Sequence, residues 1–161
     1  MRHTLSVLVE NKPGVLSRVA GLFSGRGFNI ESLTVAETLD PMVSHMTIVT
    51  RGNDQILEQI TKQLNKLINV IKVVDFMDGD HVDREIALIK VNVKDDNRSE
   101  LLSIIDIFRG KVVDVSSQSY IIEITGDEDK IAAIIDLVKP MGIKDVVRTG
   151  KVAMMRGGKS K

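Results

Sequence analysis

Hydrophobic residues in the first half of the chain follow two alternating spacings. Three stretches, Thr4–Glu10, Ile30–Glu37 and Val43–Thr50, place apolar residues at every second position, which predicts β-strands. Apolar residues at three- and four-residue spacing follow the first and third strands and predict amphipathic helices, and a last extended run closes the pattern: Val15, Leu16, Val19, Leu22 and Phe23; Ile56, Leu57, Ile60, Leu64 and Leu67; Val70–Phe76. The predicted order is β-α-β-β-α-β.

The second half repeats this order after a polar break. The run Asp78-Gly79-Asp80-His81-Val82-Asp83 interrupts the periodicity, so we assign residues 78–84 to a linker. The strands and helical stripes predicted beyond it are Ile86–Val93, Leu101 to Phe108, Val112–Val115, Tyr120–Thr125, Ile131 to Val138 and Ile143–Arg148. An α+β protein with two tandem ferredoxin-like domains, residues 1–77 and 85–161, accounts for every predicted element.

In such a domain the two helices cover only one face of the sheet. We place Leu33, Val35, Met46 and Ile48 on strand faces that the helices leave open, and these side chains are too apolar to face water. The sequence therefore predicts a homodimer.

Composition narrows the class of protein. The chain has 22 Lys and Arg residues and 22 Asp and Glu residues, so its formal net charge is zero. It therefore lacks the excess of positive charge that is typical of proteins that bind nucleic acid or anionic membranes. Cysteine is absent and no apolar run approaches the length of a membrane span, so we expect a soluble cytoplasmic protein. Four Phe, one Tyr and no Trp leave few platforms for stacking bases.

The loop Asn11-Lys12-Pro13-Gly14-Val15-Leu16 joins the first strand to the first helix. Proline suits a first helical turn, and Gly14 lets a ligand approach the backbone closely. The N–H groups of that turn form a natural cradle for a small anion such as a carboxylate. Nothing beside the loop resembles a nucleophile, a metal ligand or an acid–base pair. An ordinary strand-to-helix turn without a ligand explains the local sequence equally well.

The corresponding loop of the second half differs. Lys94-Asp95-Asp96-Asn97-Arg98 keeps a plausible helix N-cap at Asn97 but has no Pro-Gly pair. If the loop is a binding site, only the first domain has one, and the second is an interaction or scaffolding domain.

Other conspicuous residues receive structural interpretations. His3, His45 and His81 lie on different elements without ligand spacing, so we predict no metal site. The acidic linker lacks the glutamate and the length of a calcium loop, and Gly25-Arg26-Gly27 reads as a helix stop. The basic tail, residues 151–161, is expected to fray.

Several contiguous runs of residues then resemble a known family. Leu5–Asn11, Pro13–Val19 and above all Gly27–Val35 (Gly-Phe-Asn-Ile-Glu-Ser-Leu-Thr-Val) closely resemble the small regulatory subunits of acetolactate synthase, also called acetohydroxyacid synthase. Looser anchors in the second half are Phe108-Arg109-Gly110 and Arg148-Thr149-Gly150. The resemblance covers nearly the whole chain.

The resemblance implies an ACT domain that binds an effector and dimerises, followed by a second ACT-like domain. It implies no catalytic residue and no cofactor on this chain: thiamine diphosphate, Mg and FAD are expected only on a large catalytic subunit. That partner is expected to be activated by this chain and made sensitive to valine or a related branched-chain amino acid. Effector is expected between the loop of one protomer and a strand of the other, lined by Asn11, Gly14, Val15, Leu16, Asn29 and Ile30.

The chemistry of these residues fits an amino acid. The N–H groups of Val15 and Leu16 are placed to receive a carboxylate, and the amides of Asn11 and Asn29 can accept from an ammonium. Apolar walls discriminate weakly between aliphatic side chains, because one methylene is worth only about 1–3 kcal/mol. The sequence therefore does not choose among valine, leucine and isoleucine. A freestanding ACT-type amino-acid sensor acting on another enzyme is the alternative.

Two other ferredoxin-like classes fit less well. An acylphosphatase-like enzyme needs a positioned arginine in a glycine-containing phosphate cradle, where this loop has Lys12 and a proline. An RNA-binding domain needs exposed aromatic residues on its central strands, which are lacking here.

Overall fold

The computed structural model describes residues 1–158, apart from the side chain of Asp78. The chain forms two compact units, one comprising residues 1–82 and the segment from Val152, the other residues 83–151. The first unit contains β1 (Arg2–Glu10), α1 (Val15–Gly25), β2 (Ile30–Glu37), β3 (Val43–Arg51), α2 (Asp54–Lys66) and β4 (Val70–Asp75). Its antiparallel sheet has the strand order β2-β3-β1-β4. The predicted α+β, ferredoxin-like fold is confirmed for this half of the chain.

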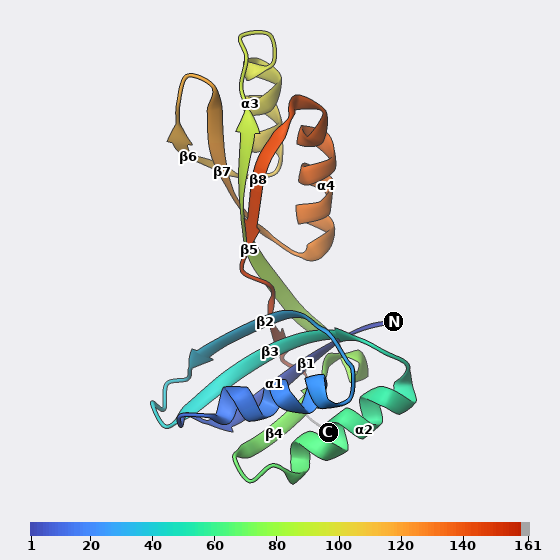
Figure 1. Ribbon diagram of the computed structural model, residues 1–161. Coiled ribbons are helices and arrows are strands. Elements are labelled where there is room, and N and C mark those ends of the chain that lie inside the picture. Colours follow the sequence, from blue (N-terminus) through green and yellow to red (C-terminus); the bar gives the residue numbers. More distant parts are fainter. Residues whose placement is uncertain (159–161) are drawn as a thin grey trace. The chain divides into compact units, whose positions relative to one another are not determined.

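One face of the first sheet is covered by α1 and α2 (Figure 1). Both helices present an aliphatic stripe to it, and the core between them has almost no exposed surface: Leu5, Val7, Val9, Val19, Phe23, Met46, Ile48, Ile60 and Leu64. The N-terminus of α2 is capped by the side chain of Asn53, which accepts from the N–H of Ile56 at 2.9 Å. Helix stripe and strand alternation therefore meet in one core, as the sequence pattern predicts.

The prediction that Leu33, Val35, Met46 and Ile48 lie on the sheet face left open by the helices is wrong. Met46 and Ile48 point into the core beneath the helices, 1% and 0% exposed, and Leu33 packs against the same core. Ile48 pairs with both Leu5 and Leu33, so alternation puts all three side chains on the helix-covered face. Only Val35, on the edge strand β2, is 38% exposed. These residues satisfy each other within one chain and give no argument for a dimer.

The opposite face of the first sheet carries small side chains instead. Thr4 pairs with Val49 and Ser6 with Thr47, and all four are buried. The C-terminal strand β9 (Val152–Met155) is not part of this sheet but contacts β1, and its Ala153 is buried as well. The C-terminal strand thus helps to cover the face that the helices leave open.

The linker and the tail also differ from the prediction. Residues 76–78 form a single 3₁₀ turn, and β5 (His81–Asn92) already begins within the segment assigned to the linker. β9 pairs with β5, and near their ends the N–H of Arg156 donates to the carbonyl of Asp80 at 3.0 Å. Part of the tail expected to fray is therefore a strand; residues 159–161 lie outside the described residues, as does the side chain of Asp78.

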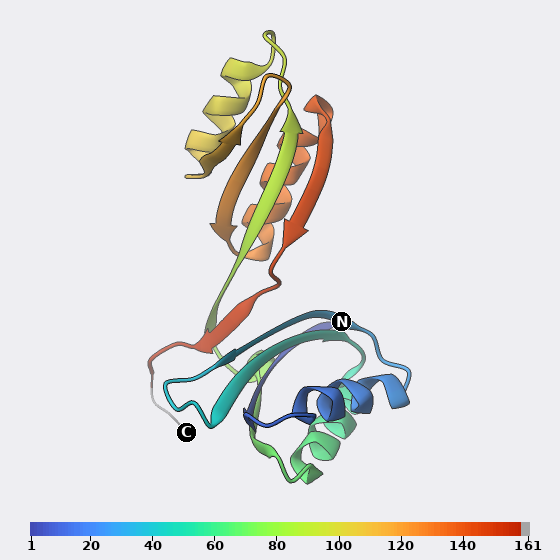
Figure 2. The same cartoon turned by 60° about the vertical axis from the view of Figure 1, so that its left-hand side comes forward.

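The second unit repeats the fold. It consists of most of β5, α3 (Arg98–Ile107), β6 (Lys111–Val115), β7 (Ser119–Gly126), α4 (Glu128–Val138) and β8 (Ile143–Arg148), with strand order β6-β7-β5-β8. Figure 2 shows α3 and α4 on one face of this sheet. The core beneath them is aliphatic: Ala87, Ile89, Val91, Leu101, Ile122, Ile124, Ile131, Ile134 and Val138. None of the helices in the described part of the chain is long and apolar enough to cross a membrane.

Candidate functional site

The loop after β1 is built around Gly14. This residue precedes the first residue of α1 and has φ +86°, a left-handed conformation that favours glycine. A Cβ placed there would meet no atom within 4 Å, so the space beside the backbone is open. The loop is tied down at its start, where the N–H of Asn11 donates to the carbonyl of Met42 at 2.8 Å.

The N-terminus of α1 is left bare of acceptors. No side chain caps it and its first turn has no acidic residue. The N–H of Val15 donates to the carbonyl of Lys12 at 3.3 Å and is engaged, contrary to our expectation. In the described part of the chain the N–H groups of Leu16 and Ser17 have no such acceptor. The N–H groups available to an anion are therefore those of Leu16, as predicted, and Ser17, which takes the place of Val15 and was not predicted from the sequence.

The amide of Asn11 is fixed by the turn between β2 and β3. Its Nδ2 donates to the carbonyl of Pro41 at 2.9 Å and to Oε1 of Glu37 at 3.2 Å. With both donor hydrogens directed within the protein, the amide oxygen is the atom left for a ligand to use. Glu37 and Pro41 lie 26 and 30 residues away along the chain, so the local sequence does not predict that they form hydrogen bonds with Asn11.

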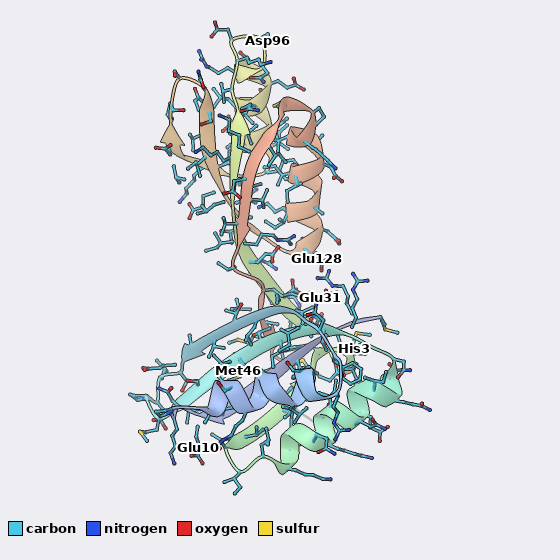
Figure 3. All side chains as sticks on the ribbon, in the orientation of Figure 1. His3, Glu10, Glu31, Met46, Asp96 and Glu128 are labelled. Carbon is cyan, nitrogen blue, oxygen red and sulfur yellow. The ribbon has the colours of Figure 1, made fainter. Side chains whose placement is uncertain are left out.

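The remaining predicted site residues divide into two groups. Val15 is 3% exposed and belongs to the core, whereas the side chain of Leu16 is 44% exposed beside the loop. Asn29 and Ile30 lie where β2 begins, and Ile30 pairs with Thr50. The first residue of β2 and the end of β1 are at opposite ends of the sheet, because Glu10 pairs with Val43 and His3 with Thr50. Figure 3 shows Glu10 and His3 at these two ends.

The separation is large. Seven residues along a strand correspond to roughly 23 Å. Within one protomer, therefore, Asn11, Gly14 and Leu16 come together, and Asn29 with Ile30 does not join them.

Charged groups stand at both ends. Next to the loop, the ammonium of Lys12 lies 2.8 Å from the Glu10 carboxylate, and this hydrogen bond and charge lower the pKa of Glu10. At the Asn29 end, Glu31 accepts from Arg51 and, at 2.7 Å, from Arg2. Partial burial alone would raise the pKa of Glu31, but these two arginines outweigh it and hold the pKa below its usual value.

A histidine lies on the sheet face opposite the helices. Nε2 of His45 is 2.5 Å from Oγ of Ser6, and burial lowers the pKa of the imidazole. His3 is enclosed at the strand start, 3.7 Å from carboxylates of Asp54 and Asp75. No group of three or more His, Asp or Glu side chains within residues 1–158 is arranged to hold a metal ion.

With this geometry established, comparison with known proteins identifies the family. Residues 5–72 match the family model described as AHAS small subunit-like ACT domain, and residues 84–157 match that of the small subunit of acetolactate synthase. A protein of Archaeoglobus fulgidus described as a probable acetolactate synthase small subunit is 57% identical over 159 residues, 99% of each chain. The chain belongs to the acetolactate synthase small-subunit family.

Other family members agree over their length. The acetolactate synthase small subunit of Aquifex aeolicus is 54% identical over 156 residues, which cover 96% of this chain and 81% of that one. The crystal structure of the small subunit from Thermotoga maritima superposes with a TM-score of 0.88 at 45% identity, over 98% of this chain and 99% of that chain. The resemblance seen in the sequence is confirmed, and so is the two-domain fold.

Proposed function

We propose that this chain is the regulatory subunit of acetolactate synthase in branched-chain amino-acid biosynthesis. In this proposal it binds valine, or a close relative, as a feedback signal and acts in the cytoplasm on a separate large subunit. Its membership in the small-subunit family supports the regulatory role. Thiamine diphosphate, Mg and FAD belong to the large subunit, and the chain itself contributes no catalytic residue.

The observation that carries the proposal is the bare N-terminus of α1 beside Gly14. Two backbone N–H groups without acceptors, the positive end of the helix dipole and open space next to a glycine together suit a carboxylate. The oxygen of Asn11 can then accept from the ammonium of the same amino acid. The exposed side chain of Leu16 offers an apolar surface for a short aliphatic group.

A two-fold dimer would complete this site. β2 is an edge strand, and an edge strand can pair with a second copy. If two copies of β2 pair in antiparallel fashion over their full length, Ile30 of one faces Glu37 of the other. The second copy's Asn29 would then lie beside the Glu37 that holds Asn11. This arrangement brings together the two groups of residues that one protomer keeps apart.

The test uses the purified chain and the large subunit of the same organism. We expect the chain alone to form no acetolactate from pyruvate with thiamine diphosphate, Mg and FAD added, and the large subunit to become more active when the chain is present. Valine should inhibit only the mixture, and leucine and isoleucine titrations rank the effectors. Sedimentation should give a dimer mass at micromolar concentration.

Two results would contradict the proposal in different ways. If the activity of the large subunit and its inhibition by valine are the same with and without the chain, the chain is not its regulatory subunit. If the chain nevertheless bound valine by calorimetry, it would be a freestanding sensor of another enzyme.

A further inference from the structure

Arg109 is the one residue other than glycine, within residues 1–158, whose φ is positive, at +55°. It directly follows Ile107 and Phe108 at the end of α3. For an L-residue with a Cβ the left-handed conformation is disfavoured, which is why glycine occupies it so often. A strained residue that persists calls for a reason outside the local turn.

The hydrogen bonds show what the turn itself requires. The N–H of Gly110 donates to the carbonyl of Ile105 at 2.8 Å and that of Arg109 to Asp106 at 3.1 Å. This is the pattern of a Schellman motif, which places Arg109 at the position where glycine is preferred. Gly110 is fixed separately, because a Cβ there would lie 2.4 Å from Cδ1 of Ile124.

The first unit ends its own α1 with the same motif but with glycine. The N–H of Phe28 donates to the carbonyl of Phe23 at 3.0 Å, and that of Gly27, at φ +72°, donates to Ser24 at 3.1 Å. The two units therefore build one turn from different residues. Glycine satisfies the turn in the first unit, so the fold alone does not explain the arginine in the second.

The side chain of Arg109 also has no structural partner. It is exposed, and in the described part of the chain it makes no hydrogen bond or ion pair. Arg98 and Arg148 of the same unit, by contrast, pair with Asp95 and Glu85. Ile107, two residues earlier, is 75% exposed and leaves apolar surface at the same helix end.

We propose that Arg109 and Ile107 form a contact with an acidic surface of the large catalytic subunit. An arginine can grip a carboxylate through two parallel hydrogen bonds, and arginine is enriched among the residues that dominate interfaces. The isoleucine exposed two residues earlier favours a protein surface over a small anion, since a protein partner can bury an apolar side chain and a free phosphate cannot. This inference rests on the proposed function and gives the second unit, which lacks the Pro-Gly loop, a part in the complex.

If this contact exists, replacing Arg109 by glycine should make the chain more stable and at the same time weaken its binding to the large subunit. Arg109→Gly should raise the melting temperature of the chain by about 2–4 °C, because it relieves the left-handed strain. The same variant should need about tenfold more chain to activate the large subunit half-maximally, because it loses the guanidinium. Ile107→Ser should weaken activation in the same assay without any rise in melting temperature.

Two further variants separate charge from strain. Arg109→Gln keeps the strained position and removes the charge, so it should weaken activation without raising the melting temperature. Lys94→Gln removes one positive charge from an exposed residue of the same unit and should leave the activation midpoint unchanged. Binding by all variants is measured by titrating the full chain into the large subunit of the same organism.

The outcomes distinguish this inference from the proposed function. If the wild-type chain neither binds nor activates the large subunit, both are wrong. If the wild type activates it and Arg109→Gly activates equally well at the same concentration, only the contact is disproved. Loss of activation by Lys94→Gln to the same degree would show a general effect of net charge and would also disprove the specific contact. If added inorganic phosphate at millimolar concentration binds the wild type and not Arg109→Gln, the residue serves a small anion instead.

Discussion

The two units share a fold and differ at the loop between their first strand and first helix. In the first unit, Gly14 leaves open space and α1 begins with no side-chain cap and no acid in its first turn. In the second, Asn97 is the N-cap residue of α3, as predicted, but its Oδ1 accepts from the N–H of Lys94 at 2.8 Å and makes no capping hydrogen bond to the helix. Glu100 lies in the first turn of α3, and Asp96 stands in the loop before it (Figure 3).

The comparison indicates why an anionic ligand would favour the loop of the first unit over that of the second. Both helices have free N–H groups and a positive end. A carboxylate ligand would meet Glu100 and the neighbouring aspartates at α3 and nothing negative in the first turn of α1. The proposed effector function therefore depends on the absence of acidic residues near α1 as much as on the residues that form the loop.

The largest effect is expected from a carboxylate placed at the first loop. Gly14→Asp should weaken valine binding more than about 100-fold and abolish feedback inhibition, because the new carboxylate fills the space and repels the ligand from the helix N-terminus. Calorimetry on the free chain and inhibition curves of the complex measure the two effects. Asn97→Asp in the second unit is the matched control and should change neither. If Gly14→Asp retained both binding and inhibition, the loop would be only a turn.

A pair of alanine substitutions separates glycines needed for packing from those needed for a ligand. Gly110→Ala should destabilise the second unit by about 1–3 kcal/mol, because its Cβ collides with Ile124 in a filled core. Gly14→Ala meets no neighbouring atom and should cost only about 1 kcal/mol through its positive φ. Urea unfolding followed separately in each unit by hydrogen exchange measures both. Equal costs would show that the open space at Gly14 closes in solution.

The far end of the proposed site should respond more moderately. Asn29→His should weaken valine binding about five- to tenfold, because a bulkier ring replaces an amide that both donates and accepts. Asn29 is exposed and its backbone carbonyl, not its side chain, accepts from Thr50, so stability should hardly change. Asn65→His, on the exposed face of α2, is the control for surface histidine. If the affinity for valine does not change, Asn29 lies outside the site, and the argument for a site shared between two protomers is lost.

The smallest expected effect is a loss of stability at acidic pH. It should be confined to the first unit, which contains all three histidines. Burial lowers the pKa of His45 below its usual 6.5, so the unfolded chain takes up the proton first as the pH falls. Stability contributed by neutral His45 is complete above about pH 6.5 and declines as the pH drops toward the lowered pKa. Hydrogen exchange in β1 and β3 should accelerate between about pH 6.5 and 5, and His45→Gln should flatten this response. A response of the same size in β7 would assign it to other groups.

Much of the fold could be read from spacing alone. Both runs of β-α-β-β-α-β follow from alternation and helical stripes, and the ends of β2, α1 and β8 agree with the prediction to within a residue. The missed strand β9 is short and forms by pairing with β5, a partner about 70 residues earlier, and such long-range pairing leaves no local pattern. The error over Met46 and Ile48 has the same origin, since alternation states which residues share a face but not which face the helices cover.

The candidate site, too, could be predicted from the sequence only in part. The sequence by itself determined the family, the repeated fold and the Pro-Gly loop that only the first unit contains, because each depends on local spacing or on a contiguous run of residues. Only the tertiary structure decided that Val15 is a core residue, that Ser17 and not Val15 has a free N–H, and that Asn11 is held by Glu37. It also decided that Asn29 lies at the far end of the sheet. The physical reason is that hydrogen-bond partners and distances across a sheet are fixed by strand pairing between residues remote in the chain.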